Sequence, residues 1–594
     1  MLGKYFKNRI SASGSLCCVI ASALTATVAF SSCSDSFLDK IPDERVEINT
    51  VDQVIQLLAS GYCTTNYGWL CEASSDNVVD VNAPYMATQS DGKEIEVRYN
   101  LNSYDRMDEE MYCFEPVRSS TGTDSPSMVW EGCYNAIAVA NHAIAILDEM
   151  KAKAGGEETE KMRAAYGEAY LIRAYYHFVL VNIFSQAYKN EEASRKDTGI
   201  PYITDPEDKV LVNYDRGNVT DTYKKIEADM LAGLERVNNV IYQKPKWHFN
   251  VNAAHAFAAR FYLYKRDYDK VIEHANAVLG EDRANLPSLL MNFGEGFDKA
   301  TSSKDYSLLW QGADVANNLM LVATYSTQWR RSVGYRFACA GKALRDVFFH
   351  LGPNWRWYRM PVSGVAGETF WDGEADHGFM SSRIAESFEY TDKVAGIGYA
   401  HIIRREFTAN ELLLERAEAY LLGRHDKAEC FADLYAYEES RQSFSEANKA
   451  FYTSGGALGS LTEQALLLWY TPSEANVKNH SNTFENWNFT QNMSADFVVP
   501  DSLTAYMNCL NDMRRYETAW TGLRFFDVKR YGYEYEHHFG PDDQLFKLEW
   551  DSPKRAIEVP QEVLVAGMEP SQPYINASGG SNIKSYNGSN MKSN

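Results

Sequence analysis

The chain has 594 residues with a net charge of −22 at pH 7, and 45% of its residues are hydrophobic. This length is enough for one large hydrophobic core or several small ones. The acidic balance argues against binding to nucleic acid or to anionic lipids, because both need clustered Lys and Arg.

The N-terminus has the pattern of an exported lipoprotein. Three basic residues lie within the first nine, and residues 16–30 form an uncharged apolar run that is too short to span a membrane comfortably. The run ends in Phe-Ser-Ser-Cys at residues 30–33, a lipobox-like site. We therefore expect 1–32 to be a lipoprotein signal peptide, Cys33 to carry the lipid, and 33–50 to be a lipidated tether. The alternative is an ordinary signal peptide with Cys33 incidental.

From residue 51 to residue 594 the sequence predicts a single, mostly α-helical domain. Apolar residues recur every three or four positions in 159–188, typical of a long amphipathic helix. Thr220 is a plausible cap for a second helix over 219–237. Further helices are predicted over 252–264, 267–279, 410–422, about 440–452 and 502–518. The pair within 252–279 is rich in alanine, which favours tetratricopeptide-like units.

Two stretches, at about 76–127 and 281–400, lose the helical period and are predicted to be loop-rich insertions, the first with short strands. The tail from Gly567 is rich in Ser, Asn and Gly and is expected to be loose. No stretch after the signal peptide is long and apolar enough to cross a bilayer.

The cysteine pattern does not indicate a scaffold of disulfides or a zinc site. Seven cysteines follow Cys33, an odd number in a long chain, and no two have CxxC spacing. Most are expected to be small buried side chains. One bridge remains possible among the first four, Cys63, Cys71, Cys113 and Cys133.

Five blocks of sequence, in order, carry a family pattern. They are Cys33 with Phe37-Leu38-Asp39 and Pro42; Gly167-Glu168-Ala169 with Arg173-Ala174-Tyr175-Tyr176 and Gly199-Ile200-Pro201; Asn252-Ala253-Ala254, Ala259-Arg260 and Leu263-Tyr264; Ala417-Glu418-Ala419; and Arg514-Arg515 with Arg524-Phe525-Phe526-Asp527-Val528-Lys529-Arg530-Tyr531-Gly532. Together they resemble the SusD/RagB family of outer-membrane nutrient-binding lipoproteins. The fifth block is less acidic than is usual in the family, and residues 281–400 match no part of it.

The resemblance implies a fold of tetratricopeptide-like helix pairs that support an irregular, loop-rich lobe. It also implies a lipid-anchored position on the outer membrane, facing the cell exterior, and a SusC-like TonB-dependent transporter as partner. The expected function is binding of a glycan and its delivery to that transporter. A peptide or another nutrient is the alternative ligand in the same role.

No catalytic motif supports an enzyme. The sequence has no GxSxG, HExxH or P-loop pattern. The pair His537-His538 is interpreted as part of a solvated loop, and no metal or cofactor is expected. Arg524, Asp527, Lys529 and Arg530 are interpreted as ion pairs that lock a helix in place, and Glu168 and Arg173 as structural in the same way. A surface glycoside hydrolase is the alternative from another class.

The ligand is expected to bind where the helical period is absent. Exposed aromatic rings can stack on sugars, and polar groups can bind hydroxyls. The stretches 66–106 and 310–380 are free to present such side chains. The predicted ligand-binding residues are Asp76, Asn77 and Tyr85 in the first, and Trp329, Tyr335, Trp355, Trp357 and Trp371 in the second. For any single ring the alternative is burial under its own loop.

Overall fold

The structure is a computed structural model. It describes residues 48–571 except 89–92, 98, 207–213, 292–299, 301, 332–334, 341, 342, 344–346, 348–380, 442–460, 474–487 and 495. The predicted signal peptide, Cys33, Trp355, Trp357 and Trp371 lie outside the described residues, as does nearly all of the helix predicted at 440–452.

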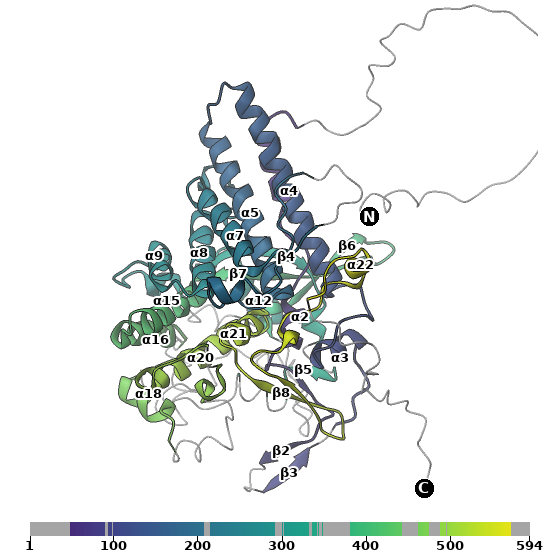
Figure 1. Cartoon of the computed structure of the whole chain (residues 1–594), viewed down its shortest axis with the longest axis vertical. Coiled ribbons are helices and arrows are strands. Elements are labelled where there is room, and N and C mark those ends of the chain that lie inside the picture. The colour runs from purple at the N-terminus through teal and green to yellow at the C-terminus, as the bar shows by residue number, and fades with distance from the viewer. Residues whose placement is uncertain are drawn as a thin grey trace, which may run out of the picture.

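A tower of long helices forms one end of the molecule (Figure 1). It consists of α4 (Pro126–Lys153), α5 (Glu160–Phe184) and α7 (Val219–Leu234), with α1 (Val51–Ala59) packed against α4 and α5. The helix predicted at 159–188 is confirmed, and the Thr159 side chain caps it. The next helix is also confirmed, but its cap is Asn218 instead of Thr220. The Thr220 hydroxyl donates instead to the Glu191 carbonyl at 2.7 Å.

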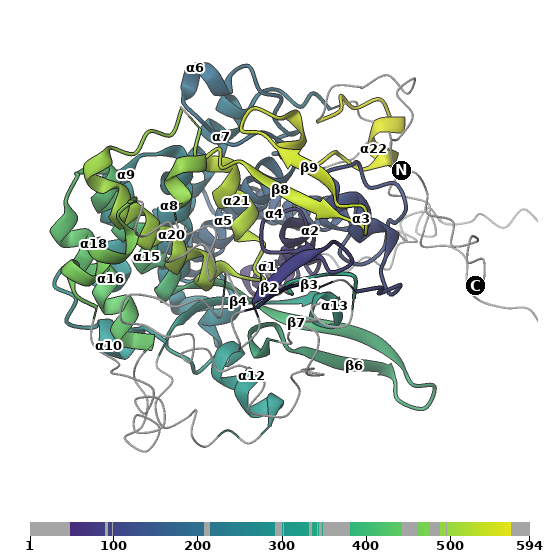
Figure 2. The ribbon, with the colours of Figure 1, turned by 90° about the horizontal axis from the view of Figure 1, so that it is seen from below.

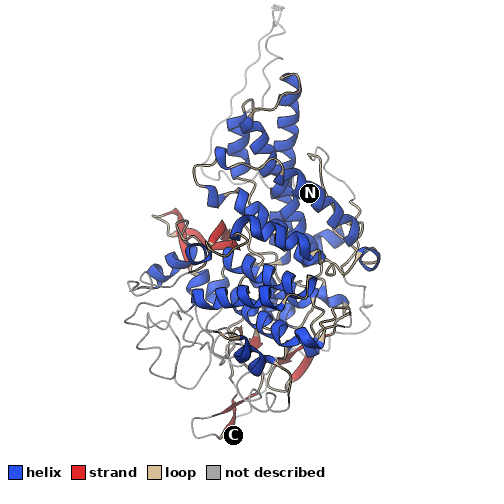
Figure 3. Ribbon diagram, turned by 90° about the vertical axis from the view of Figure 1, so that its left-hand side faces the viewer, coloured by secondary structure: helices blue, strands red, loops and turns tan. Residues whose placement is uncertain are grey.

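Below the tower, shorter helices stack in antiparallel pairs (Figures 1 and 3). α15 is central, since it packs against α8, α9, α16 and α20. The mostly α-helical fold with paired helices is confirmed. The paired helices are α8 (Val251–Lys265) with α9 (Tyr268–Leu279), α15 (Ala409–Gly423) with α16 (Lys427–Arg441), and α18 (Glu463–Tyr470) with α20 (Thr504–Thr518), which leads to α21 (Leu523–Arg530).

The remaining helices are short. They are α2 (Gly68–Ala73), α3 (Arg106–Tyr112), α6 (Glu191–Ser194), α10 (Leu286–Leu289), α12 (Ser303–Gln311), α13 (Gln328–Arg331) and α22 (Gln561–Val565). Among the described residues, none of the helices combines the length and the apolar character that a membrane span requires.

The strands form small antiparallel sheets. The largest has the order β4-β7-β6, and the others pair β1 with β5, β2 with β3, and β8 with β9. Short strands in the first irregular stretch were predicted, whereas the three-stranded sheet in the second was not. The strands are β1 (Val79–Asp80), β2 (Tyr85–Thr88), β3 (Glu94–Val97), β4 (Asn318–Tyr325), β5 (Phe337–Ala338), β6 (Glu386–Asp392), β7 (Ile397–Thr408), β8 (Tyr535–Phe539) and β9 (Gln544–Leu548).

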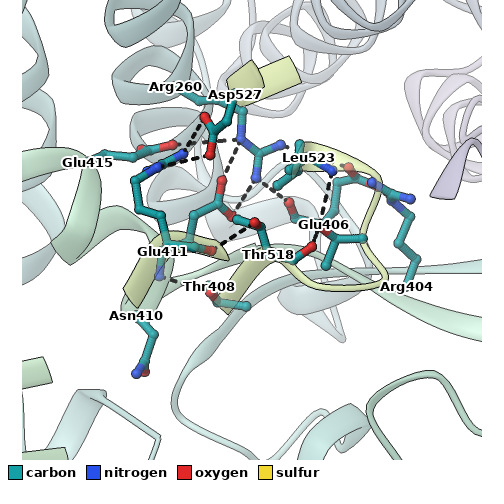
Figure 4. A network of polar contacts seen from close by, with 12 residues as sticks. Arg260, Arg404, Glu406, Thr408, Asn410, Glu411, Glu415, Thr518, Leu523 and Asp527 are labelled. Atoms are coloured by element: carbon teal, nitrogen blue, oxygen red, sulfur yellow. Dashed lines mark hydrogen bonds and ion pairs between the residues drawn. The ribbon is translucent and has the colours of Figure 1, made fainter. Parts of the chain in front are cut away.

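The principal hydrophobic core draws buried side chains from Val54 through Val559. An ionic network runs through it (Figure 4). Arg260 on α8 donates to both carboxylate oxygens of Glu411 at 3.0 and 2.7 Å, and Arg404 donates to Glu406 at 2.9 Å. The guanidinium groups of Arg404 and Arg260 hold the pKa of Glu406 below its ordinary value, although burial alone would raise it.

The fifth sequence block is structural, as predicted, with one difference. Asp527 accepts from Arg514 at 3.0 and 3.1 Å and from Arg530 at 2.7 Å. Arg524 pairs with Asp76. Among the residues that the structure describes, Lys529 has no carboxylate partner. Its ammonium donates to the backbone carbonyls at the end of α5, among them Ser185 at 2.7 Å, and burial lowers its pKa to about 7.

The second sequence block, with Glu168 and Arg173, is also interpreted as structural. Glu168 accepts from Tyr62 and Arg173 pairs with Asp229, both in buried positions, so the structural interpretation of this block is confirmed.

The histidine pair does not lie in a solvated loop. It is part of β8, where His537 is buried and His538 is exposed. All seven cysteines after Cys33 are buried, and none forms a disulfide within the described part of the chain.

Candidate ligand-binding site

The two irregular stretches meet at a very short sheet. Val79 and Asp80 in β1 pair with Ala338 and Phe337 in β5. Beside this sheet, the Arg336 backbone N–H donates to the Ser103 carbonyl at 2.9 Å. The Arg336 guanidinium donates to both oxygens of Asp80 at 2.9 and 2.6 Å. These contacts fix the segment around residue 335 beside the segment that precedes α3.

A hollow of about 690 Å³ lies between these two segments. Its volume is within the usual range for small-ligand pockets. One wall is the loop that precedes α3. The other wall is α13 together with Tyr335. The lining residues are Asn102, Ser103, Tyr104, Asp105, Arg106, Thr327, Arg330, Arg331 and Tyr335.

Buried carboxylates hold the α13 wall in place. Asp124 accepts from the Thr327 backbone N–H at 2.9 Å and from its hydroxyl at 3.1 Å. Arg331 pairs with Asp105 at 3.3 Å and with the fully buried Asp108 at 2.5 Å. Burial raises the pKa of Asp108 to about 6, and the Arg331 charge opposes this shift. The wall is therefore pre-arranged by contacts behind it.

Two guanidinium groups and two phenol rings face the hollow from its rim. The Arg106 and Arg330 side chains are 50% and 51% exposed, and each is held by a carboxylate that is itself nearly buried, Glu109 and Glu386. Tyr104 is 38% exposed and Tyr335 is half-buried. Guanidinium groups donate hydrogen bonds to hydroxyls or carboxylates, and rings stack on apolar faces. This arrangement suits an organic ligand rich in oxygen.

The comparisons with known proteins agree with the fold. Residues 36–263 match the SusD-like family model described as starch-binding and associating with the outer membrane. This part of the sequence and the fold of the chain are similar to those of the SusD/RagB family. The family is described by binding, and the description names no catalytic activity. None of the curated proteins matches the chain.

Solved structures of the SusD superfamily share this fold over most of the chain. A Bacteroides thetaiotaomicron protein has 15% identity and a TM-score of 0.52, covering 88% of this chain and 100% of its own. A Bacteroides vulgatus protein has 14% identity and a TM-score of 0.51, covering 89% and 99%. A SusD-like carbohydrate binding protein from Bacteroides vulgatus has 11% identity and a TM-score of 0.50, also covering 89% and 99%.

Within this SusD-family fold, Asp76 and Asn77 do not face the hollow. The Asp76 carboxylate is 5% exposed and accepts from Arg524 at 2.7 and 2.8 Å. The Arg524 and Arg515 charges hold its pKa below its ordinary value against the effect of burial. Asn77 is fully buried and accepts from Arg515 at 2.8 Å. Both side chains therefore connect the segment after α2 to other helices, Asn77 to α20 and Asp76 to α21.

The predicted aromatic residues are divided between different environments. Tyr335 lines the hollow. Trp329, on α13, is partly buried and packs against the principal core. Tyr85 is half-buried in β2. Trp355, Trp357 and Trp371 stay predictions, because they lie outside the described residues.

Sequence reasoning missed most of the lining of the hollow. It selected the two stretches that supply the walls, but of the lining residues it named Tyr335 and not Tyr104, Arg106 or Arg330. The available signal was Tyr104 next to Asp105, where a helix cap follows an aromatic residue in a loop. Asp105 does cap α3, accepting from the Met107 N–H at 3.0 Å.

Proposed function

We propose that the chain captures a glycan at the cell surface and delivers it to a SusC-like TonB-dependent transporter in the outer membrane. The hollow between the α3 loop and α13 is its binding site. The observation that carries the proposal is the pairing of Tyr104 and Tyr335 with the exposed guanidinium groups of Arg106 and Arg330. The family description of starch binding and the carbohydrate-binding relative support a glycan over a peptide or another nutrient.

A polysaccharide panel tests the site. Retarded migration of the protein in gels that contain one polymer, without new reducing ends, is the expected result for a binding protein. Release of reducing ends would show a glycoside hydrolase instead. Tyr104→Ala and Tyr335→Ala should each weaken the affinity about tenfold, which corresponds to about 1.4 kcal/mol.

Tyr435→Ala is the matched control, because Tyr435 on α16 has the same exposed fraction as Tyr104, 38%, and does not line the hollow. Melting temperatures separate loss of stacking from loss of folding. If both Tyr104→Ala and Tyr335→Ala keep the glycan affinity, the binding site lies elsewhere on the protein. Trp329→Ala, Trp355→Ala, Trp357→Ala and Trp371→Ala then become the next variants to measure in the same assay.

The proposal includes a lipid anchor on Cys33 and an orientation toward the cell exterior. The basic residues, the apolar run and the lipobox-like site support it. Cys33→Ala should release the protein from membranes or leave it unprocessed, and it should abolish incorporation of radiolabelled fatty acid. Continued labelling of that variant would show that Cys33 is not the acceptor.

The transporter partnership rests on the family resemblance. A neighbouring gene for a TonB-dependent channel, and recovery of that channel with the tagged full chain from solubilised outer membranes, are the expected observations. Recovery of the chain without any such channel would contradict the partnership and leave glycan binding to be judged by the panel.

A further inference from the structure

The hairpin of β6 and β7 projects from the body of the molecule beside α12 and α13 (Figure 2). β6 is the outer strand of its sheet, and nearly all of its residues are exposed. The turn is built by Asp392, whose carboxylate accepts from the Val394 and Ala395 N–H groups at 2.9 and 3.0 Å. Exposed rings on such a strand are unusual, because edge strands normally carry charged or small residues.

The register assigns these rings to two different faces. Tyr390 pairs with Gly398 and Phe388 with Ala400, so these two rings share one face. Glu389 pairs with Tyr399, which places Tyr399 on the opposite face. There the Tyr399 ring lies 5.2 Å from the Tyr325 ring of β4.

The face of β6 that carries Phe388 and Tyr390 is exposed, and we call it the shelf. The two rings are 43% and 52% exposed, and their centroids are 4.9 Å apart. The residues opposite them are the small Gly398 and Ala400. A Cβ at position 398 would collide with the Glu389 carbonyl oxygen and would come within 2.8 Å of the Phe388 ring, so a glycine is needed here for β6 and this ring to lie as they do against β7.

The shelf is linked to the rim of the hollow by an ion pair between Glu386 and Arg330. Glu386 begins the same face of β6, because residues two apart on a strand point the same way. Its carboxylate accepts from Arg330 at 2.9 and 2.5 Å, and Arg330 is on the rim of the hollow. From Glu386 to Tyr390 the strand extends about 13 Å. The two rings therefore lie on the same face of β6 as the carboxylate that holds Arg330, and within about 13 Å of it along the strand.

We propose that the Phe388–Tyr390 face of the hairpin is an extension of the hollow that holds the continuing part of a long glycan chain. The chain thereby binds polysaccharides more tightly than short oligosaccharides of the same sugar. This inference rests on the proposed function, since the hollow anchors one part of the ligand. An extended polymer fits the shelf because apolar sugar faces stack on rings, and the small residues beside the rings leave room for it.

The test uses the polymer that binds in the panel and short oligosaccharides cut from it. Phe388→Ala and Tyr390→Ala should weaken binding of the polymer about tenfold and leave binding of the short oligosaccharides unchanged. Tyr399→Ala is the matched control. It removes a ring of similar exposure, 56%, from the other face of the same hairpin, and the polymer affinity should not change.

Three results would overturn the extension. They are unchanged polymer affinity in both shelf variants, an equal loss in Tyr399→Ala, or an equal loss for the short oligosaccharides. A change in sedimentation caused by Tyr390→Ala would instead assign the face to a second copy of the chain. Tyr335→Ala separates this proposal from the hollow, because it should weaken both ligands. Absence of binding to any glycan would contradict the proposed function itself.

Discussion

His177 in α5 is fully buried, and both of its ring nitrogens face backbone groups. The Ile203 N–H donates to Nε2 at 3.1 Å, so the ring proton is on Nδ1, which donates to the Arg173 carbonyl at 2.8 Å. The Tyr202 ring stacks on the imidazole at 3.8 Å. Burial lowers the pKa of His177 to about 3. The folded protein therefore holds this histidine neutral.

This neutral histidine should make the protein sensitive to acid. The unfolded chain takes up the proton near pH 6.5 and the folded chain only near pH 3, so stability is present above about pH 6.5 and is lost as the pH falls. Between about pH 7.5 and pH 5 the loss from this group is about 2 kcal/mol. In His177→Gln, urea unfolding at both pH values should show a pH-dependent loss smaller by that amount, whatever its stability at neutral pH. An equal loss in both proteins would contradict the buried neutral state.

At the scale of helices and strands, prediction succeeded where local signals were long. In the α5 segment, six apolar residues recur at helical spacing between residues 165 and 183, and all six are buried in the structure. The Thr159 side chain caps the helix where the sequence predicts its start. The cap of α7 was misassigned because Asn218 and Thr220 are both suitable residues. Only the tertiary contact with Glu191 takes the Thr220 hydroxyl away from the helix end.

The three-stranded sheet was missed in part because β4, one of its two outer strands, lacks alternation. β4 reads Asn-Leu-Met-Leu-Val-Ala-Thr-Tyr, and its first five residues are buried on both faces. A short apolar run of this kind has no period that separates strand from helix. The β1–β5 pair is only two residues long and has no sequence signal, yet it brings Tyr335 beside Tyr104. The two stretches that supply the walls of the hollow were therefore predictable, but most of the residues that line it were not.

Across the whole molecule, buried ion pairs join helices that are far apart in sequence. Glu418 on α15 accepts from Arg530 on α21 at 2.5 and 2.7 Å and from the Tyr531 hydroxyl at 2.6 Å. Arg530 also donates to Asp527, which accepts from Arg514 on α20. Three helices are thereby tied at a point where their charges are excluded from water. The paired carboxylates raise the pKa of Arg530 despite its burial.

Removing one charge from this network should cost far more than removing one from the surface. Glu418→Gln keeps the shape of the side chain but leaves the buried Arg530 guanidinium with one carboxylate instead of two. Breaking a buried pair in this way costs about 3–5 kcal/mol of unfolding free energy. Asp269→Asn is the control, because the Asp269–Arg424 pair joins side chains that are 79% and 49% exposed. It should cost less than about 1 kcal/mol. Urea unfolding followed by circular dichroism measures both, and equal costs would mean that packing alone holds α15, α20 and α21 together.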